Sequence, residues 1–146
     1  MTDSETNQKK RTPITTMHNM IVDYVAGKAP PPQLAFHNLD RIQEDENFLF
    51  RADLSGASIR LGSFRQSNIK EARMGWTWLM NTDFTGSEFN KATLDHARGN
   101  AVTRFTYCDL SQASVRDAQF VGTSFGSAKL IGTDFGGSDL QEAHME

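Results

Sequence analysis

The chain has little of what secreted and membrane-bound proteins depend on. It has one cysteine among 146 residues, so no internal disulfide can form, and no apolar run approaches the roughly 18 to 20 residues that span a bilayer. Its first residues, Met-Thr-Asp-Ser-Glu-Thr-Asn, lack the basic and apolar regions of a signal peptide. We therefore expect one cytoplasmic domain that does not contact a membrane, with Cys108 as a packing residue.

Residues that commonly build catalytic or metal sites are scattered along the chain. The four histidines have no cysteine partners and no carboxylates at the spacing that zinc ligands show; they are His18, His37, His96 and His144. No glycine-rich phosphate loop follows a predicted strand and opens a helix. We therefore expect no catalytic residue, no metal and no cofactor, and we predict that the protein is not an enzyme.

A five-residue repeat is present from Phe48 to the C-terminus. A bulky apolar residue recurs at every fifth position, a small residue lies two places before it, and the other three places are mainly polar. Helices and strands have periods of about 3.6 and 2 residues, so neither element presents this pattern as one face. The repeat indicates a solenoid of stacked coils. Its large positions are Leu49, Leu54, Ile59, Phe64, Ile69, Met74, Leu79, Phe84, Phe89 and Leu94, then Phe105, Leu110, Val115, Phe120, Phe125, Leu130, Phe135, Leu140 and Met145.

The repeat resembles that of the pentapeptide-repeat family. The family consensus is Ala, then Asp or Asn, then Leu or Phe, then two variable polar residues, and Ala52-Asp53-Leu54-Ser55-Gly56 is similar to it. The resemblance covers about two thirds of the chain. It implies an all-β fold, a right-handed quadrilateral β-helix of about five coils with four repeats in each coil. Residues about twenty apart should then stack, and such a column is formed by Phe64, Phe84, Phe105 and Phe125.

One irregularity interrupts the register between Leu94 and Phe105, where the spacing of large residues grows by one. We predict a one-residue bulge at a coil corner over Arg98–Val102. Gly99 and Asn100 lie in this segment, and both residue types tolerate the left-handed backbone that an insertion often needs.

The first 47 residues do not follow the repeat. Residues 1–11 are polar, and we expect them to be disordered. Residues 12–47 are predicted to form a cap or an arm, with one helix marked by apolar residues between Pro13 and Gly27 and a second short helix from Asn38 towards Glu46. Two interpretations stay open: a helical or extended cap on the β-helix of residues 48–146, or a detached arm that docks on a partner.

The last predicted coil has no comparable cap. An uncovered β-edge invites pairing, and pairing of two identical chains about a two-fold axis is the commonest solution. We therefore expect a homodimer, which is also how the antibiotic-resistance members of the resembled family associate. The predicted interface is formed by Leu130, Phe135, Leu140 and Met145.

A second predicted surface lies around one coil corner, where Trp76, Trp78 and Met80 all occupy outward positions. The register places His96 beside Trp76 and Arg98 beside Trp78. Buried apolar groups are the norm in a folded protein, whereas large apolar groups that the repeat directs towards water can indicate an interaction site. Three interpretations stay open: the N-terminal segment folds back over the tryptophans, the cluster binds a partner, or the exposure has no function.

Two functions follow from these observations. The first is a non-enzymatic interaction or scaffold protein with a protein partner of unknown identity. The alternative is implied by the resemblance, because some bacterial members mimic B-DNA and regulate DNA gyrase and related topoisomerases, which confers antibiotic or toxin resistance. Residues 105–146 carry six acidic and two basic side chains, but residues 48–146 carry eleven and ten. DNA has one charge per roughly 1.7 Å of its axis, so the acidic charges of this chain are far sparser than those of DNA. We also expect no direct nucleic-acid binding.

Overall fold

The computed structural model describes residues 14–146, so the predicted tail of residues 1–11 lies outside the described part. One helix, α2, spans Ile14–Val25. It buries Met17 and Ile21. No helix within residues 14–146 is both long and apolar enough for a membrane crossing.

The C-terminus of α2 is closed by a Schellman motif. The amide of Gly27 donates to the carbonyl of Tyr24, and the amide of Lys28 donates to the carbonyl of Asp23. Gly27 has a φ of 74°, a left-handed conformation that glycine adopts without steric cost. The predicted end of the helix at Gly27 is therefore confirmed.

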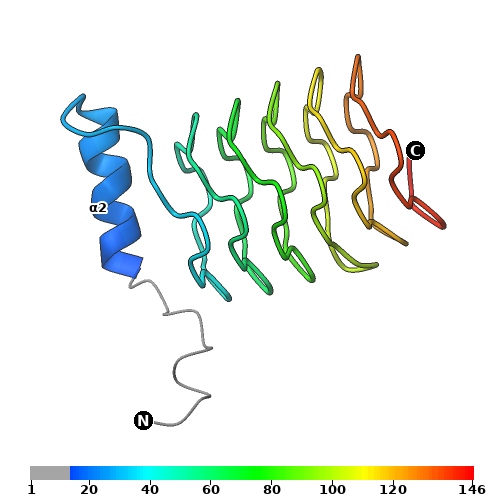
Figure 1. Ribbon diagram of the computed structural model, residues 1–146, viewed down its shortest axis with the longest axis horizontal. Coiled ribbons are helices and arrows are strands. Elements are labelled where there is room, and N and C mark those ends of the chain that lie inside the picture. Colours follow the sequence, from blue (N-terminus) through cyan, green and yellow to red (C-terminus); the bar gives the residue numbers. More distant parts are fainter. Residues whose placement is uncertain (1–13) are drawn as a thin grey trace, which may run out of the picture.

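From Gln33 onwards the chain forms a β-helical solenoid of stacked, parallel coils (Figure 1). Pairing between coils consists of isolated bridges rather than continuous strands; the first joins Gln33 to Asp53, and the last joins Ser124 to His144. Bridges recur every five residues and join residues 20 or 21 apart, so each coil has four sides. Five coils and part of a sixth result: 33–52, 53–72, 73–92, 93–113, 114–133 and 134–146.

The solenoid begins 15 residues, or three repeats, earlier than the sequence predicts. The expected helix from Asn38 to Glu46 is wrong, because Asn38 forms a parallel bridge with Ser58 in the next coil. The predicted boundary at Phe48 is therefore too late, and residues 33–47 belong to the β-helix.

Polar residues at core positions explain why this first coil is hard to recognise. Glu44 occupies a large apolar position and is almost fully buried, while Asn47 occupies a small position. The side-chain amide of Asn47 donates to the carboxylate of Glu44, so the two polar groups satisfy each other. Leu34 and Leu39 keep the pattern at the neighbouring large positions.

Helix α2 covers the open end of this first coil (Figure 1). Met17 and Ile21 belong to the same buried cluster as Leu34 and Leu39. The ring of Tyr24 packs on the outward ring of Phe48, with 5.5 Å between centroids. The described part of the N-terminal segment is therefore packed as a cap, which shields the end of the core from water.

The predicted phenylalanine column is confirmed. Phe64, Phe84, Phe105 and Phe125 are buried, and successive rings are 5.8, 5.2 and 5.2 Å apart with interplanar angles of 18°, 11° and 6°. Phe89 meets this column edge-on, 5.2 Å from Phe84. Because Phe84 and Phe105 are each stacked between rings of two adjacent coils, the column joins the coils into one core.

The small core positions also carry hydrogen bonds between coils. The hydroxyl of Ser87 donates to the carbonyl of Phe64 over 2.6 Å, and the thiol of Cys108 donates in the same way to the carbonyl of Phe84 over 2.9 Å. Burial raises the pKa of the Cys108 thiol to about 12. Cys108 is thus a neutral packing residue in the structure, as the repeat predicts.

Most coil corners are turns with one left-handed residue. In the first coil, the amide of His37 donates to the carbonyl of Leu34, and Phe36 between them has a φ of 62°. This is the geometry of a type II turn. The same corner position carries Trp76 and His96, with φ of 61° at both residues.

The predicted insertion is confirmed, but its predicted backbone is wrong. Asp83 bridges to Arg104, a step of 21 residues, yet neither Gly99 nor Asn100 has a positive φ. Gly99 stands at a large core position, where an added Cβ would lie 2.7 Å from the ring of Phe120. Glycine is needed there for close packing rather than for a left-handed conformation.

Asn100 stabilises the enlarged corner with its side chain. Its Oδ1 atom accepts hydrogen bonds from the amides of Asn81, Val102 and Thr103, each over 3.1 Å. Its Nδ2 atom donates to the side-chain carbonyl of Asn81 over 2.7 Å. The asparagine side chain thus replaces backbone partners that the extra residue displaces.

Candidate interaction surface

Exposed apolar side chains gather on one of the four sides of the solenoid. This side, with the two corners that bound it, comprises residues 35–41, 55–61, 75–81, 95–102, 116–122 and 136–142; we call it the tryptophan face. Among the described solenoid residues, nine large apolar side chains are exposed, and six lie on this face: Phe36, Leu61, Trp76, Trp78, Val102 and Val121. The remaining three, Tyr107, Ile131 and Met145, lie elsewhere. These ranges hold 43 of the 114 solenoid residues, so an even distribution would place three or four of the nine on this face, and six is an enrichment.

The first corner of the face forms an aromatic hollow of about 300 Å³, lined by Phe36, Gly56, Trp76, Trp78, His96 and Arg98. Trp76 stacks on His96 with 4.1 Å between ring centroids and 12° between planes, yet remains 61% exposed. Phe36 is 69% exposed, and its ring lies against Gly56, where an added Cβ would come within 2.5 Å of it. The absence of a side chain at Gly56 therefore leaves the space that the ring of Phe36 occupies.

Arg98 lies over the ring of Trp78, with its Cζ atom 4.8 Å from the ring centroid. This cation–π contact restrains the guanidinium and leaves its N–H edges free to donate. Arg98 has no ion-pair partner within residues 14–146.

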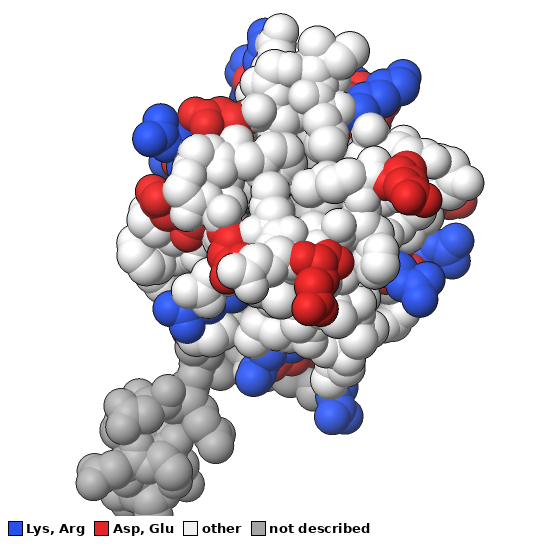
Figure 2. Space-filling view, turned by 90° about the vertical axis from the view of Figure 1, so that its right-hand side faces the viewer, with Lys and Arg blue, Asp and Glu red and all other residues white. Residues whose placement is uncertain are grey.

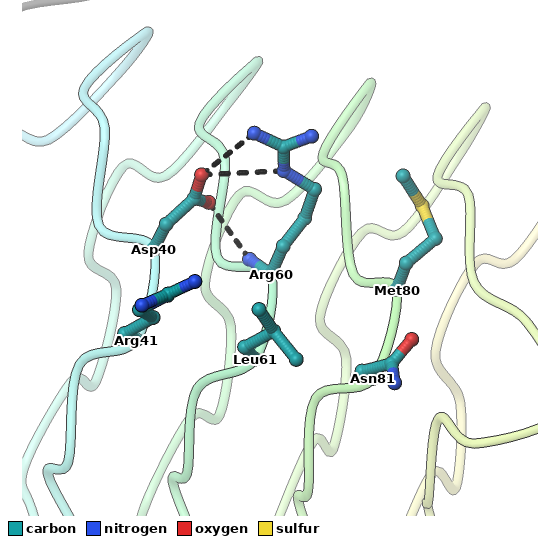
Figure 3. Close-up of a pocket in the computed structure, with 6 residues that line it drawn as sticks. All are labelled: Asp40, Arg41, Arg60, Leu61, Met80 and Asn81. Atoms are coloured by element: carbon teal, nitrogen blue, oxygen red, sulfur yellow. Dashed lines mark hydrogen bonds and ion pairs between the residues drawn. The ribbon is translucent and has the colours of Figure 1, made fainter.

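The opposite corner of the face forms a second, more polar hollow (Figure 3). Asp40 accepts hydrogen bonds from the hydroxyl of Ser58 over 2.5 Å, from the Arg60 amide over 2.9 Å and from the Arg60 guanidinium over 2.8 Å. Burial alone would raise the pKa of the Asp40 carboxyl, but these hydrogen bonds hold that pKa below its ordinary value. Asp40 and Arg60 therefore satisfy each other. Arg41 lines the same hollow without a carboxylate partner among the described residues.

The predicted residues divide between the two hollows. Trp76 with His96 and Trp78 with Arg98 come together as the register predicts. Met80 is half-buried and lines the polar hollow instead. Helix α2 covers the end of the solenoid and does not line the hollow of the tryptophans, whereas Phe36 of the same N-terminal segment borders that hollow.

The sequence interpretation missed Phe36, Gly56 and Leu61. Phe36 lies 20 residues before Gly56 and 40 before Trp76, so extending the repeat by one coil would have placed it in the same corner column. The polar residues in the core of the first coil concealed that register.

The C-terminal end of the solenoid, residues 130–146, has apolar side chains at its centre and acidic side chains around them. Leu130, Phe135 and Leu140 are half-buried, and Met145 is 43% exposed. Residues 130–146 carry four acidic side chains and no lysine or arginine. Viewed from this end, uncharged atoms and acidic patches occupy the face, while basic groups lie at its rim (Figure 2).

Four five-residue repeats in each coil define this molecule as a β-helical repeat protein. The sequence profile of pentapeptide repeats matches residues 49–86 and 108–146 in eight copies. The chain therefore belongs to the pentapeptide-repeat family. No curated protein matches the chain by sequence.

Solved structures that are similar to this chain include the following three proteins. The pentapeptide repeat protein Rfr23 from the cyanobacterium Cyanothece 51142 is 14% identical, with a TM-score of 0.61 over 89% of this chain and 99% of that one. HetL, involved in heterocyst differentiation regulation in Nostoc sp. strain PCC 7120, is 14% identical, with a TM-score of 0.48 over 87% and 93%. QnrB1, a plasmid-mediated fluoroquinolone resistance protein, is 17% identical, with a TM-score of 0.30 over 78% and 74%. At these identities the likeness to Rfr23 concerns the fold alone.

Proposed function

We propose that this protein is a non-enzymatic interaction protein, which binds a protein partner through the tryptophan face. The observation that carries the proposal is the gathering of six exposed large apolar side chains on one side of a rigid solenoid. Trp and Arg dominate the residues that contribute most to protein interfaces, and both occur here as preorganised pairs. The solenoid supplies the rigid support, and the partner supplies the activity that is regulated or localised.

The test is the double substitution Trp76→Ala, Trp78→Ala. Both side chains are outward, so the free energy of unfolding should change little, by about 1 kcal/mol or less once the ring contacts are counted. Binding of the partner should weaken by about 2 kcal/mol or more, because removal of a hot spot has that effect. The measurement is capture of partner proteins from the source organism, with melts of both variants as the folding check.

Tyr107→Ala is the matched control. Tyr107 is 67% exposed and occupies the same left-handed corner position as Trp76, but at a different corner. The Tyr107→Ala variant should therefore capture the partner as well as the wild type does. Retention by the tryptophan variant as well would contradict the proposal.

We include in this proposal a homodimer through the last coil, with Leu130, Phe135, Leu140 and Met145 in contact across a two-fold axis. The support is the half-exposed apolar centre of that coil. The acidic side chains of residues 130–146 would face their counterparts, so the dimer should strengthen as salt is added.

Regulation of DNA gyrase is the alternative function. The observation in its favour is the charge of residues 105–146, six acidic against two basic side chains, which an end-to-end dimer would double. The tryptophan face has no role in that function, so the two proposals predict different sensitive residues.

A further inference from the structure

Two arginines on the tryptophan face have no ion-pair partner among the described residues. In the first four coils the face carries Arg41, Arg60 and Arg98 against Asp40 and Asp95. Asp40 is paired with Arg60. Neither Arg41 nor Arg98 has an ion-pair partner within residues 14–146.

The second acid of this region is already occupied by hydrogen bonds. Asp95 Oδ1 accepts from the hydroxyl of Ser114 over 2.6 Å and from the amide of Arg116 over 2.9 Å. Both donors are neutral and leave the negative charge of Asp95 in place, so three arginines against two aspartates give the face of the first four coils a net charge of +1. The far end of the same face carries Asp117, Asp139 and Glu142 against Arg116, so its net charge is −2.

Arg98 is the better prepared of the two arginines. Stacking on Trp78 holds its guanidinium in one orientation, and a planar guanidinium binds a carboxylate through two parallel N–H···O bonds. The aromatic hollow lies directly beside it, between Phe36 and Trp76. A carboxylate and an apolar group that are close together in one ligand would therefore both be accommodated.

We propose that the aromatic hollow binds a short acidic-apolar segment of a partner protein, with an Asp or Glu side chain on Arg98 and a neighbouring apolar side chain between Phe36 and Trp76. This inference rests on the proposed function and adds the chemistry of the partner. Charge complementarity selects an acidic segment. The acidic residues at the far end of the face restrict such a segment to the first four coils.

The chain offers a direct optical measurement. Its two tryptophans, Trp76 and Trp78, both line the hollow, so tryptophan emission reports this site alone. The probe is a capped hexapeptide made of two glutamate-leucine-proline units. One control peptide replaces glutamate by lysine, and the other replaces leucine by serine. Capped ends ensure that only side-chain carboxylates are present.

We expect a saturable change of emission with the glutamate-leucine peptide and at least about ten-fold weaker binding of both control peptides. Arg98→Gln should weaken binding of the first peptide by about ten-fold or more, because charge-assisted hydrogen bonds are lost. Arg98→Lys should give an intermediate loss, since lysine keeps the charge but not the planar fork. Arg104→Gln is the matched control, an exposed arginine on another side without an ion-pair partner among the described residues, and should leave binding unchanged.

Equal binding of the lysine peptide, no effect of Arg98→Gln, or no emission change at millimolar peptide would each overturn the inference. A dimer in sedimentation velocity that Trp78→Asp dissolves would also overturn it, because the face would then be covered by a second copy. If the double tryptophan variant loses a captured partner while the peptides fail to bind, the proposed function stands and only this inference fails. Capture that is independent of the tryptophans would remove the proposed function itself.

Discussion

Phe84 tests the architecture on which the tryptophan face depends. The ring is fully buried, stacked between Phe64 and Phe105 at 5.8 and 5.2 Å, and in edge-on contact with Phe89. Phe84→Ala should destabilise the fold by about 3 to 5 kcal/mol. We expect the upper part of that range, because the coils on both sides are held by bridges and cannot collapse into the cavity.

Urea unfolding followed by circular dichroism measures this loss. Phe84→Leu retains most of the volume and should cost clearly less, while Tyr107→Ala removes an exposed ring and should stay within about 0.5 kcal/mol of the wild type. In a stacked array the damage can be local, so a separate early transition for the coils around Phe84 would also fit the reasoning. A single midpoint equal to that of the wild type would refute it.

Three further predictions concern the thiol, the last coil and the alternative function. Burial raises the pKa of the Cys108 thiol from 9.0 to about 12 in the folded protein. The contribution of the neutral thiol to the free energy of unfolding is therefore fully present below pH 9 and is lost as the pH rises towards 12, by up to about 4 kcal/mol. In chemical unfolding, Cys108→Ser should lose less stability over that interval than the wild type. Leu140→Glu with Met145→Glu should give a monomer in sedimentation equilibrium at every salt concentration, and a wild-type chain that is monomeric at high micromolar concentration would remove the dimer. DNA supercoiling by gyrase should be unchanged by an excess of the protein, and inhibition that survives the double tryptophan substitution would favour the alternative function.

Much of the solenoid could be predicted because its period is unlike that of any other element. The column from Phe64 to Phe125 follows from spacing alone, and the insertion follows from one altered step. The first coil could not be recognised, because Glu44 and Asn47 stand where the repeat expects apolar and small residues, and their mutual hydrogen bond is visible only in three dimensions. The prediction of a left-handed backbone at Gly99 was wrong for a related reason. Glycine is required there because Phe120 of the next coil approaches closely, and not because of the local backbone conformation.

The candidate site was predicted in part. Register pairs Trp76 with His96 and Trp78 with Arg98, because residues one coil apart must stack. Phe36 was missed together with its coil. That the charges of Asp40 and Arg60 cancel while Arg41 and Arg98 stay unpaired depends on side-chain geometry, which periodicity does not determine.

Quenching of tryptophan emission by acrylamide measures whether the tryptophan face is covered when the partner binds. Trp76 is 61% and Trp78 is 39% exposed, and the chain has no other tryptophan, so emission from the free protein should be quenched readily. In a saturated complex with the partner captured by the wild-type chain, we expect strong protection of both rings and a shifted emission maximum. Quenching that is the same in the free protein and in the complex would contradict the claim that this face is the binding surface.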